Sequence, residues 1–114
     1  PVATDWLIER NLYRHPFRGA NSLTFWDSLE HIHDPRLHLS GAKEYVFVSC
    51  PIYEDSEHIK RSKHFRKDEH CWYWTIEGLT TFMDAFGFEI QEINWMETEL
   101  GREDIGTFVF KRYS

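Results

Sequence analysis

Apolar and β-branched residues gather in short runs separated by polar stretches, and this pattern predicts four strands. We expect the strands at residues 22–26, 45–50, 88–96 and 105–110. The run at 45–50 (YVFVSC) is apolar at successive positions instead of alternating, which is typical of a parallel strand covered on both faces. Pro51 should end it, because proline cannot donate to a sheet ladder.

One helix is predicted clearly, between the second and third strands. Thr75 is suited to cap its start, its apolar residues recur at helical spacing, and Gly87 suits its C-terminal cap. A second, short helix is expected at residues 4–10. Residues 52–74 form a long irregular connection, and residues 97–104 a polar turn. Together these elements indicate an α/β domain with helices packed on a sheet of about four strands, ending in an antiparallel hairpin.

Composition limits the class of protein further. The 114 residues are 41% hydrophobic and 17% aromatic, which is enough for one core and argues against disorder. A net charge of -6 gives no attraction to nucleic acid or to an anionic membrane, and no apolar run reaches the length of about 20 residues that spans a bilayer.

Two cysteines are too few for a disulfide framework, so we expect a cytoplasmic protein. Because the first residue is Pro1, we expect a processed or trimmed chain, or a piece of a longer one.

Three segments, in this order, resemble the class I S-adenosylmethionine-dependent methyltransferases. Residues 25–35 (FWDSLEHIHDP) are similar to the family pattern D-x-L-E-H-x-x-D-P, and residues 46–51 (VFVSCP) to a strand ending in S-x-P. Residues 70–79 (HCWYWTIEGL), followed by AFGFEI at 85–90, resemble H-x-x-x-F-T-x-E-G-L and a late G-F-E-V turn. The likeness extends over about residues 20–112.

The resemblance implies a partial Rossmann-like sheet, the C-terminal half of a methyltransferase domain. Our four strands would be the family's fourth to seventh, the last antiparallel, with S-adenosylmethionine across the carboxyl ends of the parallel strands. None of the six glycines forms the family's G-x-G turn, and the acidic end of its second strand has no counterpart. We therefore expect the missing N-terminal half to be a partner, and the chain alone to expose a sheet edge.

By the same resemblance, Trp26 and Asp27 lie beside the cofactor, where an aromatic face would attract the sulfonium. The alternative is a core aromatic and a strand-end cap. Glu30 and His31 would be the catalytic pair, orienting the cofactor or serving as acid and base in O-methylation. A structural hydrogen bond between loop and helix is the alternative for this pair.

The acceptor substrate is expected to lie under the basic segment 58–67. Lys63, His64 and Arg66 in it would recognise a phosphate or carboxylate, although charge runs are usually solvated faces. Pro51, His70 and Tyr73 complete the predicted substrate-binding residues. His70 has an alternative role as an orienting residue before the late helix.

Two hypotheses follow for function. The first is a methyltransferase, or a fragment of one, that acts on a small-molecule acceptor. The second is a non-catalytic truncated module that self-associates as a homo-oligomer or binds a partner. A zinc site is a weaker third possibility, because four residues of metal-binding type lie close in sequence without a recognised ligand spacing: His64, Glu69, His70 and Cys71. We predict no metal site.

Overall fold

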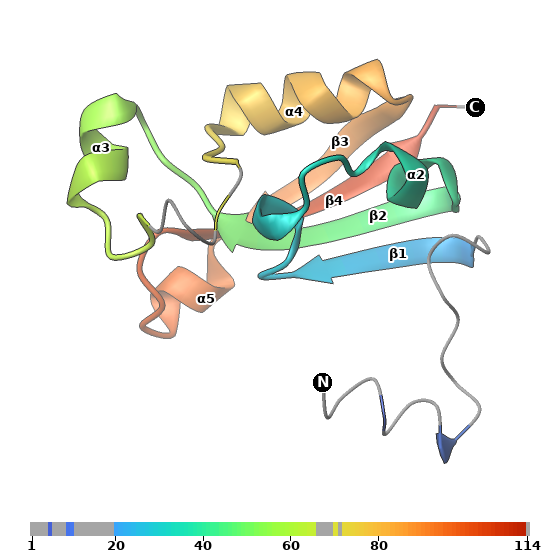
Figure 1. Ribbon diagram of the computed structural model, residues 1–114, viewed down its shortest axis with the longest axis horizontal. Coiled ribbons are helices and arrows are strands. Elements are labelled where there is room, and N and C mark those ends of the chain that lie inside the picture. Colours follow the sequence, from blue (N-terminus) through green and yellow to red (C-terminus); the bar gives the residue numbers. More distant parts are fainter. Residues whose placement is uncertain (1–4, 6–8, 11–19, 66–69, 71, 114) are drawn as a thin grey trace.

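A computed structural model describes residues 5, 9–10, 20–65, 70 and 72–113, and these form one four-stranded mixed sheet with helices packed on it (Figure 1). The strand order is β1-β2-β4-β3. The strands are β1 (Ala20–Trp26), β2 (Ala42–Pro51), β3 (Phe88–Asn94) and β4 (Ile105–Arg112). The expected helix at 4–10 lies largely outside the described residues, as do Arg66, Glu69 and Cys71.

The strand directions bring three strand ends to one edge of the sheet. β1 and β2 are parallel, and β4 runs antiparallel to both β2 and β3. The carboxyl ends of β1, β2 and β3 therefore meet at the same edge, where ligands bind in open α/β sheets. This confirms the predicted α/β class, the four strands and the C-terminal antiparallel hairpin.

The helices include one that was predicted and several that were not. The predicted helix is α4 (Ile76–Ala85); the Thr75 hydroxyl caps it by accepting the Gly78 N–H at 2.9 Å, and Gly87 follows it with a φ of 90°. The other described elements are η2 (Leu29–His31), α2 (Arg36–Ser40), α3 (Ser56–Arg61) and α5 (Met96–Glu99). They are too short for an apolar repeat to reveal. The helix α3 lies within residues 52–74, which we expected to be irregular. The helix α5 occupies the start of the expected turn at 97–104 and also Met96, which we expected to be the last residue of the third strand.

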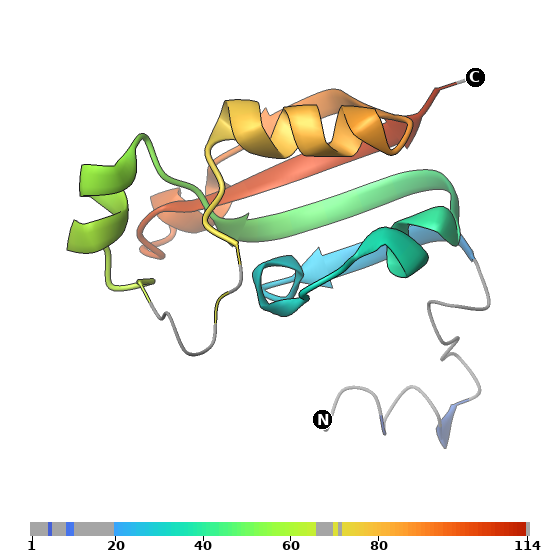
Figure 2. The same ribbon diagram turned by 45° about the horizontal axis from the view of Figure 1, so that its top comes forward.

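The core fills the space between one face of the sheet and α2 and α4, which lie over that same face (Figure 2). Leu79 and Met83 of α4 are fully buried there. Trp72 and Trp74 stack with their ring centroids 4.9 Å apart and contact Phe82 of α4. This aromatic stack anchors the segment that follows His70.

The other face of the sheet is less covered than expected. Val46 and Val48 of β2 are buried, but Tyr45 and Phe47 on the opposite face are only half-buried by the described residues. The prediction that both faces of this strand are covered is therefore wrong for the part of the chain that the structure describes. β1 is an edge strand there, as the resemblance implied. None of the described helices has both the length and the apolar character needed to cross a membrane.

Candidate functional site

A cavity of about 230 Å³ opens at the carboxyl ends of β1 and β2. Seven of the described residues line it: Asp27, Glu30, His31, Pro51, His64, His70 and Arg102. All except Arg102 were singled out from the sequence. The fold therefore gathers residues from both the expected catalytic pair and the expected acceptor side around one small polar space.

Asp27 turns the chain sharply at the end of β1. Its backbone is left-handed, with a φ of 53°, a conformation that aspartate adopts more readily than most residues. Its N–H donates to the Ser49 carbonyl at 2.8 Å, which ties the turn to β2. Its carboxylate oxygen Oδ2 lies 3.0 Å from Nη2 of Arg102. Arg102 comes from the connection before β4, and no local pattern connects it with Asp27.

A chain of polar contacts continues from Arg102 to the end of β2. Arg102 Nη1 donates to Glu97 Oε1 at 2.9 Å, and the buried Ser49 hydroxyl donates to Glu97 Oε2 at 2.5 Å. The Ser49 hydrogen bond, and secondarily Arg102, lower the pKa of Glu97. The serine of the Ser-Cys-Pro strand end thus links β2 to α5 and, through Arg102, to the tip of β1.

Glu30 is a buried carboxylate, only 2% exposed, on η2. Burial raises its pKa above the ordinary value. Its Oε1 lies 3.5 Å from Nε2 of His31, while Oε2 has no hydrogen-bond partner among the described residues. The Glu30 carbonyl accepts the Trp72 N–H at 3.2 Å, which joins η2 to the segment carrying His70.

His70 completes a cluster with Glu30 and His31. The rings of His31 and His70 meet edge to face, with their centroids 4.5 Å apart. One ligand atom from each of the three residues lies within 4.8 Å of the others. One carboxylate and two imidazoles form a donor set that suits a divalent metal ion such as Zn²⁺ or Mn²⁺. This cluster differs from the group of four weighed from the sequence, because Glu30 and His31 reach His70 only through the fold.

Of the other residues predicted to bind cofactor or substrate, His64 lines this cavity, whereas Trp26, Lys63 and Tyr73 do not. Trp26 is 56% exposed and belongs to the less covered face of β1, so it is not a core aromatic. Lys63 is exposed in the turn after α3, whereas His64 bonds the Glu103 carbonyl through Nε2 at 2.7 Å. The Tyr73 ring lies against His70, with centroids 6.0 Å apart. Among the described basic residues of the segment 58–67, only His64 lines the cavity.

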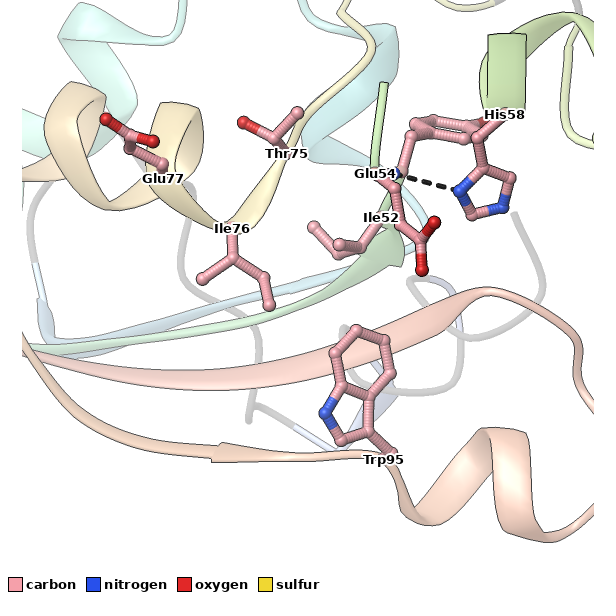
Figure 3. Close-up of a pocket in the computed structure, with 8 residues that line it drawn as sticks. Ile52, Glu54, His58, Thr75, Ile76, Glu77 and Trp95 are labelled. Carbon is pink, nitrogen blue, oxygen red and sulfur yellow. Dashed lines mark hydrogen bonds between the residues drawn. The ribbon is translucent and has the colours of Figure 1, made fainter. Parts of the chain in front are cut away.

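A second, larger cavity of about 480 Å³ lies at the same sheet edge, between β2, β3 and the start of α4 (Figure 3). Its lining residues are Ile52, Tyr53, Glu54, His58, Thr75, Ile76, Glu77 and Trp95. Except for His58, in the basic segment, and the helix cap Thr75, sequence reasoning gave these residues no role. They come from two strand ends, a loop, α3 and a helix start, so no single motif marks them.

Two solved structures are similar in fold to this chain. LaPhzM aligns over 98% of this chain and 39% of its own, with a TM-score of 0.61 and 12% identity. The methyltransferase domain of bacterial CtHen1-C aligns over 90% of this chain and 57% of its own, with a TM-score of 0.50 and 19% identity. No family model and no curated protein matches the sequence. The chain therefore has a methyltransferase fold, and it spans less than two thirds of either structure.

Proposed function

We propose that this chain is the acceptor-side part of a class I S-adenosylmethionine-dependent methyltransferase domain, and that Glu30, His31 and His70 activate the acceptor. The observation that carries the proposal is the position of this cluster, at the carboxyl edge of a methyltransferase sheet. The cavity there is small and polar, so it suits the reacting group of an acceptor better than the whole of a large one.

The chemistry required of these residues is modest. When bound, S-adenosylmethionine supplies an electrophilic methyl group, and transfer of that group from sulfur to the acceptor depends mainly on alignment. A hydroxyl acceptor must also lose its proton as the new bond forms. In this proposal the His31 side chain, 40% exposed, takes that proton, and the neighbouring Glu30 carboxylate stabilises the imidazolium that results.

The cofactor side is only partly present in this chain. Trp26 offers an open aromatic face at the end of β1, and Asp27 has its Oδ2 paired with Arg102, which leaves Oδ1 outside that ion pair. These residues fit one wall of a cofactor site. The glycine-rich turn has no counterpart in the sequence. We therefore propose that the contacts to the methionine part come from a separate N-terminal half, and that this chain alone does not retain the cofactor.

The same cluster fits a divalent metal ion. Oε2 of Glu30 is buried without a hydrogen-bond partner among the described residues, an arrangement that is costly unless something compensates it. Glu30, His31 and His70 would hold the ion, which, when bound, lowers the pKa of a coordinated hydroxyl. Metal binding and a histidine base are two ways for one cluster to prepare an acceptor.

The proposal is tested by methyl transfer from radiolabelled S-adenosylmethionine to a panel of hydroxyl compounds. The assay uses the longest polypeptide that the coding region specifies, with and without Mn²⁺. His31→Ala should lower the rate by about 100-fold or more, the usual contribution of a positioned acid or base. His33→Ala is the matched control, because His33 is an exposed histidine two residues away. Equal rates for the two variants would exclude His31 from the reaction.

The second candidate is a non-catalytic module that self-associates. The observation in its favour is the edge strand β1, whose outer side is unpaired by the described residues. Sedimentation and calorimetry separate the two functions. A stable dimer that binds no S-adenosylmethionine, even within the longest polypeptide, would favour the module and contradict the methyltransferase.

A further inference from the structure

The cavity of Figure 3 has the size and composition of a ligand site. Its volume of about 480 Å³ falls within the range of roughly 300–1,000 Å³ found for small-molecule pockets. Ile52 and Ile76 supply apolar walls, and Trp95 an aromatic one. In Figure 3 the Glu54 carboxylate points down from the loop after β2, toward the side of the cavity on which Trp95 lies, while that of Glu77 lies farther away on α4.

The charges around this cavity are acidic. Glu54 and Glu77 both line it, and neither forms an ion pair with any residue that the structure describes. Among the lining residues that the structure describes, the only basic side chain is that of His58. Its Nδ1 accepts the Glu54 N–H at 2.9 Å, and its Nε2 lies 2.9 Å from Oδ1 of Asp104. Both ring nitrogens are engaged, so His58 is not available to pair with a ligand's anion.

The cavity wall is held in place before any ligand arrives. The His58 contacts tie the loop after β2 to Asp104, before β4, and the Ile52 N–H donates to the Asp104 carbonyl at 2.7 Å. On the opposite side, the Thr75 hydroxyl caps α4. This cap and the acidic Glu77 in the first turn offset the positive end of the helix, which would otherwise favour an anion. A rigid wall lowers the cost of ordering on binding.

We propose that this cavity binds an organic cation, a protonated amine carried on a compact apolar body. A carboxylate next to an aromatic ring is the combination that recognises such a cation, because both attract positive charge and the apolar walls take the body. The ammonium group would lie between Glu54 and Trp95, and the body against Ile52 and Ile76. Binding of this kind requires neither the cofactor nor methyl transfer, so it stands apart from the proposed function.

The test compares three probes of one shape and different charge: phenethylammonium, 2-phenylethanol and phenylacetate. Each is titrated into the full chain, and the indole N–H resonance of Trp95, assigned with Trp95→Phe, is followed by NMR. We expect phenethylammonium to shift it saturably and to bind about tenfold more tightly than the alcohol. Phenylacetate should bind more weakly still.

Glu54→Gln should reduce the affinity for phenethylammonium to that for the alcohol and leave the affinity for the alcohol unchanged. Glu44→Gln is the matched control: it makes the same charge change on an exposed residue near the start of β2, at the far end of the strand. Circular dichroism verifies folding, and Glu77→Gln, at the helix start, should give a smaller loss in the same direction. Absence of a saturable shift, equal binding of the amine and the alcohol, or equal effects of Glu54→Gln and Glu44→Gln would overturn the proposal.

Discussion

Asp27 and Arg102 form an ion pair, 3.0 Å between Oδ2 and Nη2, that joins the end of β1 to the connection before β4. Both residues line the small cavity, and Arg102 also donates to Glu97, whose other carboxylate oxygen accepts the Ser49 hydroxyl of β2. Three segments that are distant in sequence are thus aligned at the strand ends by one guanidinium group.

Arg102→Gln should disturb the geometry of the site more than the stability of the fold. The side chains of Arg102 and Asp27 are both nearly half exposed, so water screens their attraction and the loss of unfolding free energy should be below about 1 kcal/mol. The backbone resonances of Asp27 and its neighbours should nevertheless shift. Urea denaturation and NMR measure the two effects. A loss of several kcal/mol would show that Arg102 is chiefly structural.

Glu30→Gln should preserve or raise stability at neutral pH. Burial raises the pKa of Glu30, so the folded state holds its proton more tightly than the unfolded state does. The contribution of Glu30 to stability therefore falls as the pH rises from the unfolded value toward the folded one. Glutamine removes this dependence and the buried charge, and we expect a gain of about 1 kcal/mol at pH 7. Thermal unfolding at several pH values checks the sign, and a clear loss at pH 7 would contradict it.

If Glu30, His31 and His70 bind a metal ion, the variant His70→Ala should lose that binding. Co²⁺, which takes similar ligands to Zn²⁺, should give visible absorption bands with the unaltered chain at one equivalent. His70→Ala removes one of three donors and should abolish the bands at that concentration. His33→Ala, which changes an exposed histidine outside the cluster, should leave them unchanged. Bands of equal strength in both variants would place the metal elsewhere.

Ser49→Ala should reduce the sensitivity of the fold to acid. The Ser49 hydrogen bond lowers the pKa of Glu97, so the stabilisation that comes from ionised Glu97 is present above the ordinary glutamate pKa. It is lost as the pH falls through the lowered value. Without the serine hydroxyl this contribution shrinks, and the variant should lose less stability than the unaltered chain between about pH 5 and pH 3. Urea titrations at those pH values measure the difference, and equal slopes would refute it.

The elements most predictable from the sequence are those whose signals are local. The cap at Thr75, the left-handed Gly87 and the apolar repeat between them define α4 within a dozen residues, and the structure confirms all three. The short apolar and β-branched runs predicted the four strands for the same reason, because each run is a local signal. Short helices such as α3 and α5 show no such repeat, because an apolar repeat becomes visible only over several helical turns.

The residues of the candidate site also differ in how far the sequence predicted them. Asp27, Glu30 and His31 are close in sequence, and the family pattern at 25–35 was enough to select them. Their meeting with His70 and Arg102, and the position of Glu54 and Trp95 on one cavity, depend on strand order and on loops that return to the same sheet edge. Burial of Glu30 is also decided there, because desolvation comes from neighbours that are remote in the chain. Sequence alone determined the four strands, the helix α4 and the side chains that follow the first two strands, since those signals rest on contacts within a few residues. Only the tertiary structure decided which of those side chains share a cavity.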